Sequence, residues 1–97
     1  MKHLNKKVII RTEKAGVHFG ILDKYENKEA SLRESIRIWY WDGANSLSEM
    51  ALSGVKKPES CKFSVKLDEI HVCGVIEIIP CTDEAIKIIE NVKPWKY

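Results

Sequence analysis

Polar and apolar side chains alternate with a period of two between residues 30 and 41, and this pattern constrains the fold more than any other feature. A period of two places successive residues on opposite faces of a β-strand. One face of the predicted strand therefore carries Leu32, Glu34, Ile36, Ile38 and Tyr40, and the other carries Arg33, Ser35, Arg37, Trp39 and Trp41.

Two further strands are predicted before this segment, each rich in β-branched and aromatic residues. They cover residues 7–12 (KVIIRT) and 17–25 (VHFGILDKY), and short polar turns follow both. Gly20, inside the second strand, predicts a bulge or a close approach of another backbone. Short connections favour pairing between neighbours, so the three strands are expected to form an antiparallel meander.

A short helix is predicted over residues 46–53, after a turn at Asp42 and Gly43. Ser46 and Glu49 have the spacing of a capping box, and Gly54 suits the end of the helix. At about two turns, such a helix depends on packing rather than on intrinsic propensity.

The C-terminal half predicts two more strands and a second helix. Residues 61–67 alternate, with Phe63, Val65 and Leu67 expected inside, and a break is expected at Asp68 and Glu69. Residues 70–79 form the most apolar segment, which predicts a central strand covered on both faces, with a possible bend at Gly74. Thr82 is a suitable N-cap for a helix over residues 83–92.

Together these elements predict a single α+β domain over residues 1–97. Its twisted antiparallel sheet has about five strands and is either open or barrel-like. A short connecting helix near 46–53 and a C-terminal helix near 83–92 complete it. A chain of 97 residues can bury one core but is small, so association into a homo-oligomer is expected.

Composition and charge limit the binding partners and the cellular location that the sequence predicts. A net charge of +2 is too small to argue for nucleic-acid or membrane binding on bulk electrostatics. The longest apolar run falls far short of a membrane span, and the start, MKHLNKK, lacks the apolar part of a signal peptide. Three cysteines without a CxxC pair suit a reducing compartment. A cytoplasmic protein without a membrane partner is therefore predicted.

Motifs for catalysis and for metal binding are weak throughout the sequence. No serine lies in a GxSxG elbow, and no glycine-rich phosphate loop is present, so we predict a non-enzyme without catalytic residues or a cofactor. His71 and Cys73, even with Cys61, Cys81 and His18, match no strong zinc spacing. We therefore predict no metal site.

The face carrying Arg33, Arg37, Trp39 and Trp41 offers the most distinctive chemistry. Indoles stack on nucleobases, and guanidinium groups pair with phosphates. The ordinary alternative is burial of the indoles, either within the protein or against a second copy of it.

Five blocks carry a family resemblance that spans nearly the whole chain: VIIRT at 8–12, AGVHFG at 15–20, RIWYWDGANSLSEMALSGV at 37–55, KFSV at 62–65 and IEIIPCT at 76–82. On these blocks the sequence resembles a family of small, uncharacterised proteins encoded by bacteriophages and prophages. The family has no agreed activity and no established catalytic residues.

A phage origin would imply an accessory protein that evades host antiviral defence. One such route is the sponge, which sequesters a cyclic or modified nucleotide signal without chemistry, as antagonists of the Thoeris and CBASS systems do. The residues expected to bind the ligand are Arg33, Arg37, Trp39, Trp41, Asn45, Ser46, His18 and Arg11. The alternatives are an inhibitor of a host defence enzyme or nuclease, a single-stranded nucleic-acid-binding accessory protein, and an enzyme that degrades the signal.

Overall fold

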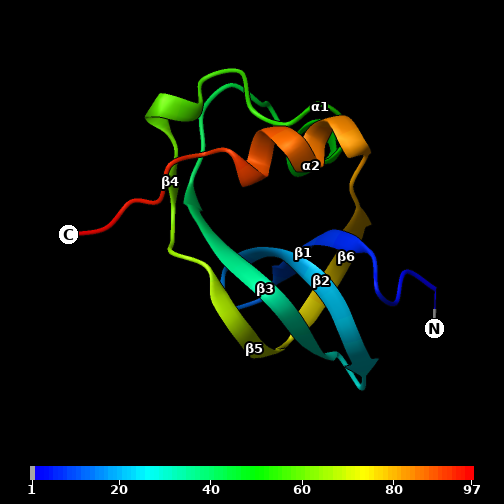
Figure 1. Ribbon diagram of the computed structural model, residues 1–97. Helices are drawn as coiled ribbons and strands as arrows, with labels where there is room; N and C mark the ends of the chain where they lie inside the picture. Colours follow the sequence, from blue (N-terminus) through cyan, green and yellow to red (C-terminus); the bar gives the residue numbers. More distant parts are fainter. Residues whose placement is uncertain (1) are drawn as a thin grey trace.

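A computed structural model describes residues 2–97 as six antiparallel strands in one open sheet, with two helices on the same side of it (Figure 1). The strand order is β4-β3-β2-β1-β6, and β5 also pairs with β3. The strands are β1 (Lys7–Thr12), β2 (Val17–Glu26), β3 (Glu29–Tyr40), β4 (Lys62–Phe63), β5 (Leu67–Cys73) and β6 (Val75–Pro80). The predicted α+β class and the meander of the first three strands are confirmed.

Both predicted helices are present and begin at the predicted caps. They are α1 (Leu47–Ser53) and α2 (Asp83–Glu90), and a short 3-10 helix, η1 (Pro58–Ser60), lies between them in the sequence. The hydroxyl of Ser46 accepts from Glu49 N at the start of α1, and the hydroxyl of Thr82 accepts from Ala85 N at the start of α2. Within residues 2–97 neither helix has the length or the apolar character to cross a bilayer.

The predicted central strand over residues 70–79 is wrong, because this segment forms the two edges of the sheet. It divides at Gly74, whose φ of 74° is readily adopted only by glycine. On one side β5 pairs with β3, and on the other β6 pairs with β1. The corner is held by two backbone bonds, from Glu13 N to Gly74 O (2.9 Å) and from Val75 N to Lys28 O (2.9 Å).

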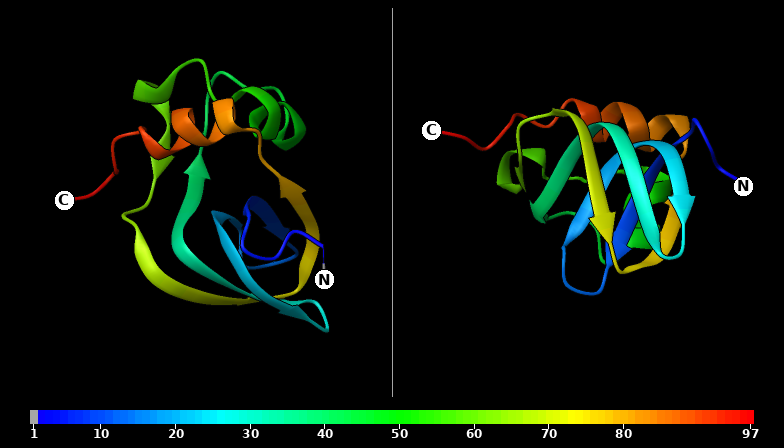
Figure 2. Two further views of the ribbon diagram at one scale, coloured as in Figure 1. Left: turned by 45° about the vertical axis from the view of Figure 1, so that its right-hand side comes forward. Right: turned by 90° about the horizontal axis from the view of Figure 1, so that it is seen from below.

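The sheet therefore curls until its two edge strands meet at Gly74 (Figure 2). Over residues 2–97 no ladder joins β5 to β6, so the sheet is open rather than a closed barrel. The predicted cover on both faces is also missing at β6, where Ile76 is 49% exposed.

The predicted strand over residues 61–67 is largely wrong as well. Lys62–Phe63 pairs with the end of β3, with Phe63 opposite Ile38, and Leu67 already belongs to β5. The chain then leaves the sheet, which leaves Val65 exposed. The expected break at Asp68 and Glu69 is absent, because both residues lie inside β5. Three short strands in residues 61–80 thus replace the two long ones predicted there.

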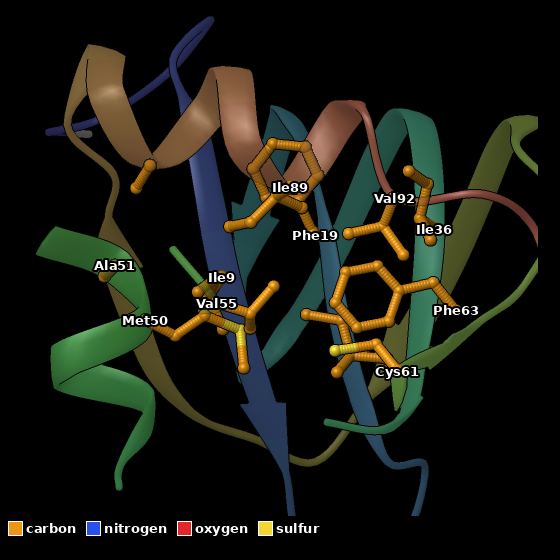
Figure 3. Packing of buried hydrophobic residues seen from close by; sticks show 12 residues of the cluster. Ile9, Phe19, Ile36, Met50, Ala51, Val55, Cys61, Phe63, Ile89 and Val92 are labelled. Atoms are coloured by element: carbon orange, nitrogen blue, oxygen red, sulfur yellow. The ribbon is translucent and has the colours of Figure 1, made fainter. Parts of the chain in front are cut away.

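The apolar residues form two clusters on opposite faces of β1. Ile9 belongs to the first cluster, which fills the space between the sheet and the two helices (Figure 3). Val8 and Ile10 belong to the second cluster, which fills the inside of the curled sheet together with Leu22, Ala30, Leu32, Val72 and Val75. The central strand β1, rather than the apolar segment near the C-terminus, is thus covered on both faces.

A bulge in β3 breaks the predicted alternation of that strand. Phe19 pairs with Ile36 and Ile21 with Arg33, so β3 has one more residue than β2 at this point, and Glu34 adopts a φ of 49°. Gly20 lies opposite the bulge, where a Cβ would come within 3.0 Å of Arg33 O, which confirms the predicted close approach.

The bulge also corrects the predicted faces of β3. Leu32 packs in the second cluster, whereas Ile36 and Ile38 pack in the first, so these residues do not share one face. Arg33 lies on the opposite face from Arg37, because Arg33 is paired with Ile21 and Arg37 with His18.

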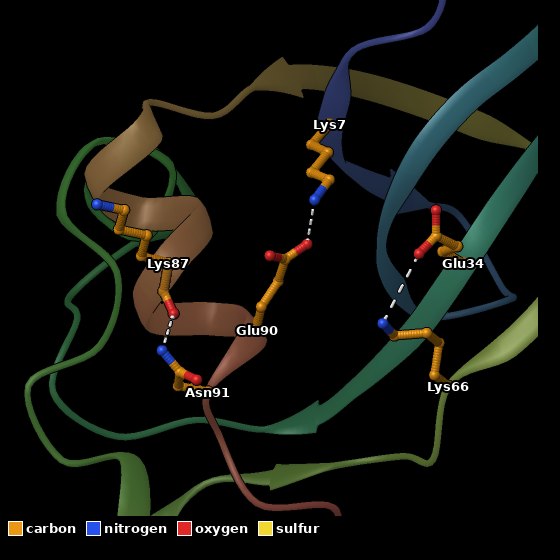
Figure 4. Close-up of polar contacts among 6 residues, drawn as sticks. All are labelled: Lys7, Glu34, Lys66, Lys87, Glu90 and Asn91. Atoms are coloured by element: carbon orange, nitrogen blue, oxygen red, sulfur yellow. Dashed lines mark hydrogen bonds and ion pairs between the residues drawn. The ribbon is translucent and has the colours of Figure 1, made fainter.

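Polar contacts at the surface reinforce this packing only weakly. Lys7 of β1 forms an ion pair with Glu90 of α2, and Lys66 lies 3.8 Å from the Glu34 carboxylate (Figure 4). Exposed pairs of this kind typically contribute about 0–1 kcal/mol each. The helices are therefore held to the sheet mainly by the first apolar cluster.

Candidate functional site

A surface groove lies where the β1–β2 turn approaches the end of β3. We call it the Trp39 groove, and its volume is about 430 Å³. β3 extends past the start of β2, because Val17 is paired with Ile38 and the residues after Ile38 have no partner on β2. The lining residues are Lys14, Ala15, Gly16, Val17, Arg37, Ile38, Trp39 and Trp41.

Arg37 supplies a cation that no carboxylate neutralises. Arg11 forms an ion pair with Glu77 (2.7 Å), and Arg33 forms one with Asp23 (3.0 Å), but within residues 2–97 the Arg37 guanidinium has no such partner. Its backbone is fixed, because Arg37 N donates to Ser64 Oγ (2.8 Å) and Ser64 N donates to Arg37 O (2.9 Å). The groove thus holds an arginine whose backbone is fixed and whose guanidinium has no carboxylate partner in the part of the chain that the structure describes.

The two indoles of the groove differ in exposure. Trp39 is 66% exposed, while Trp41 is half-buried and packs against the first apolar cluster. Burial within the protein, the ordinary expectation for tryptophan, therefore holds only in part for Trp41 and not for Trp39. One indole is anchored, and the other presents a large apolar surface to solvent.

The β1–β2 turn that forms the opposite wall is tied down by side chains. Thr12 Oγ1 accepts from Ala15 N (2.8 Å) and donates to Gly16 O (2.8 Å). Gly16 has a φ of 85°, and a Cβ there would meet no atom within 4 Å. The backbone conformation therefore favours glycine at this position, although there is room for a side chain. This wall is expected to be firm.

His18 braces the same turn from inside the protein. Its side chain is fully buried, and Nε2 is bonded to Ala15 O at 2.8 Å. Burial lowers the pKa of His18, and the neighbouring Arg37 charge lowers it further. The imidazole is therefore neutral, with Nε2–H as donor, and Nδ1 has no hydrogen-bond partner within residues 2–97. His18 supports the groove but does not line it.

The other predicted ligand residues lie away from the groove. Asn45 and Ser46 precede α1, where Asn45 N donates to Glu49 Oε1 (2.6 Å) and Ser46 caps the helix. Neither residue is among those that line the Trp39 groove. Arg11 and Arg33 are held in the ion pairs described above.

The structure therefore brings together three of the eight predicted residues, Arg37, Trp39 and Trp41. Sequence reasoning missed Lys14 and the turn residues. The predicted antiparallel meander could have indicated them, because in such a meander the turn between the first two strands lies near the end of the third strand.

These features define the class of protein: a small α+β domain with an open groove lined by cationic and aromatic side chains. The chain belongs to the family of the domain of unknown function DUF6948, whose family model matches residues 5–89. The matched region contains every residue that lines the Trp39 groove. No curated protein matches the sequence.

Proposed function

We propose that the protein binds a cyclic or modified nucleotide in the Trp39 groove and sequesters it without chemical conversion. The observation that carries this proposal is the arrangement of an unpaired Arg37 beside two indoles, with Lys14 on the facing turn. A phosphate would pair with the guanidinium, and a base would stack on Trp39.

The energetics favour such a ligand over a purely apolar one. Stacking of a base on an aromatic side chain contributes about 1–3 kcal/mol. Hydrogen bonds between ionised partners are roughly twice as strong as neutral ones. A flat, anionic molecule uses both interactions, whereas an apolar molecule would leave Arg37 and Lys14 without partners.

Binding without conversion is supported by the composition of the lining. The described residues that line the groove include no carboxylate, imidazole, hydroxyl or thiol group. These groups supply most general bases and nucleophiles. His18 is paired with Arg37 in the sheet, but its side chain is buried and does not line the groove.

The biological setting that we propose is evasion of host antiviral defence by a phage-encoded protein acting in the host cytoplasm. The resemblance to phage and prophage proteins supports this setting. We further propose that the protein acts as a homo-oligomer, because the groove is open and a second copy would cover the exposed face of a bound ligand. Sequestration requires slow release, which such cover would provide.

The test is binding of cyclic dinucleotides, cyclic trinucleotides and ADP-ribose-derived signals to the full chain, by thermal shift and then by calorimetry. Trp39→Ala should weaken binding roughly 5-fold to 150-fold, which corresponds to the loss of about 1–3 kcal/mol of stacking. Arg37→Gln alone should weaken binding more than Trp39→Ala does, because it removes a charged hydrogen-bond donor. Arg11→Gln is the matched control, since it removes an exposed arginine already paired with Glu77.

Three outcomes would count against the proposal. Failure of the whole panel to bind would refute it. Equal losses in Arg37→Gln and Arg11→Gln would place the ligand elsewhere. Recovery of an altered nucleotide after denaturation would make the protein an enzyme.

A second candidate, an inhibitor of a host defence protein, is favoured by exposed aromatic residues outside the groove. Tyr40, next to Trp39, is half exposed, and Trp95 is also exposed, with Lys62 Nζ 5.0 Å from the centroid of its ring. Aromatic residues beside cations are common at protein interfaces. Trp95→Ala should impair this function but leave nucleotide binding unchanged.

A further inference from the structure

A separate cluster of metal-ligating side chains lies at the other end of β3, around Glu29, His71 and Cys73. The register of the β3–β5 ladder produces it, because Glu29 is paired with Cys73 and Ser31 with His71. Residues two apart on a strand share a face, so all four side chains project from the same side of the sheet. The Trp39 groove is formed by the opposite end of β3.

The distances in this cluster suit a bound cation. One ligand atom from each of the three residues lies within 4.8 Å of the others, and His71 Nε2 is 2.7 Å from Glu29 Oε1. The usual bond lengths of tetrahedral zinc place its ligand atoms about 3.4–3.6 Å apart. A zinc ion would therefore separate the His71–Glu29 pair by less than about 1 Å and draw the thiol in by at most about 1.3 Å.

Ser31 orients the imidazole for this role. Its Oγ lies 3.0 Å from His71 Nδ1, and this contact directs Nε2 toward Glu29. Metal-binding histidines commonly use their second nitrogen in such a hydrogen bond, which fixes the ring and its tautomer. The arrangement thus includes the supporting contact as well as the ligands.

The surroundings leave space for further ligands. His71, Glu29 and Ser31 border a depression of about 270 Å³, together with Lys24, Glu26 and Asn27. A water molecule or the Glu26 carboxylate could occupy a fourth position. The Lys24 ammonium opposes a cation, but the Glu26 and Glu29 carboxylates outweigh its charge.

We propose that Glu29, His71 and Cys73 form a zinc site with a fourth, exchangeable position. A mixed set of imidazole, thiolate and carboxylate selects zinc over magnesium or calcium, which prefer oxygen ligands alone. The sequence predicts no metal site because Glu29 is 42 residues from His71, and only the β3–β5 register joins them. This proposal is independent of nucleotide binding.

The test is titration of the full, reduced chain with Co²⁺ as a spectroscopic probe, followed by Zn²⁺ competition against a chromogenic chelator. Wild type should develop a thiolate-to-cobalt charge-transfer band that zinc abolishes. Cys73→Ala should remove the band, while Cys81→Ala, which alters a half-buried thiol outside the cluster, should retain it. Ser31→Ala should weaken zinc binding by about tenfold, and His71→Ala by more than that.

Thermal unfolding of each variant without metal provides the folding control, and because the ligands are exposed, the variants should unfold near the wild-type temperature. A charge-transfer band that survives in Cys73→Ala would overturn the proposal. So would zinc affinity in His71→Ala equal to that of His3→Ala, a variant of a histidine outside the cluster.

Discussion

Replacing Gly54 with alanine should destabilise the protein strongly, because this residue lies at the contact between α1 and α2. Gly54 ends α1 and donates its N–H to Met50 O (2.8 Å). Its φ and ψ are 74° and −152°, a combination that is essentially confined to glycine. A Cβ on Gly54 would lie 2.7 Å from Ile88 Cβ and 2.8 Å from Ile88 Cγ2, both on α2.

The expected cost has two parts. Backbone strain of this kind costs about 1–3 kcal/mol. Forcing an extra methyl group into packed structure costs about 1–3 kcal/mol more. The sum is about 2–6 kcal/mol, which for a domain of this size corresponds to a fall in melting temperature of at least about 8 °C.

Gly16→Ala is the matched control, since Gly16 also has a positive φ but a Cβ there would have no atom within 4 Å. It should show the strain without the steric overlap. Chemical denaturation of both variants measures the difference. Free energies of unfolding that agree within about 0.5 kcal/mol would refute the reasoning that the α1–α2 contact excludes a side chain. Ile88→Ala should partly rescue Gly54→Ala, because it removes the Cγ2 atom.

Three further predictions concern single side chains. Thr82→Ala should lower the free energy of unfolding by about 1–2 kcal/mol, because it removes the hydroxyl that caps α2 and donates to Leu52 O (2.7 Å). Urea denaturation measures this loss, and Thr82→Ser, which keeps the hydroxyl, should be close to wild type. Iodoacetamide at pH 8 should alkylate exposed Cys73 well before Cys81, since burial raises the pKa of Cys81 to about 12; mass spectrometry of the labelled peptides would show the order. The free energy of unfolding should fall as the pH drops below about 6.5, because the pKa of His18 is lower in the folded protein and the unfolded state therefore binds a proton first. This loss should be smaller in His18→Gln. Thermal unfolding of both proteins across this pH range measures the difference.

The parts of the fold that the sequence predicts correctly depend on local signals. Both helices begin at residues whose side chains cap them, Ser46 and Thr82. The first three strands follow from β-branched runs joined by short turns. No local pattern indicates that β5 and β6 are edges, because their position depends on partners far away in the sequence. Gly74 within an apolar segment predicts a bend, but no local signal indicates that both edges of the sheet meet there.

The candidate sites depend on register, which the sequence does not specify. Lys14 reaches the Trp39 groove because the β1–β2 turn lies beside the end of β3. Glu29 meets His71 only through the β3–β5 ladder. Both juxtapositions are long-range, and residue types alone therefore predicted the chemistry of Arg37, Trp39 and Trp41 but not their neighbours.

The bulge at Glu34 explains why Arg37 and Arg33 lie on opposite faces of β3. Without the extra residue, Leu32 and Ile36 would share a face, yet each fills a different apolar cluster. Exposing either side chain would cost about 1.5–3 kcal/mol, so both clusters favour the bulge. The same extra residue sends Arg33 to the opposite face, where it pairs with Asp23. Core packing thus separates the two arginines, and Arg33 rather than Arg37 lies on the face where Asp23 is available.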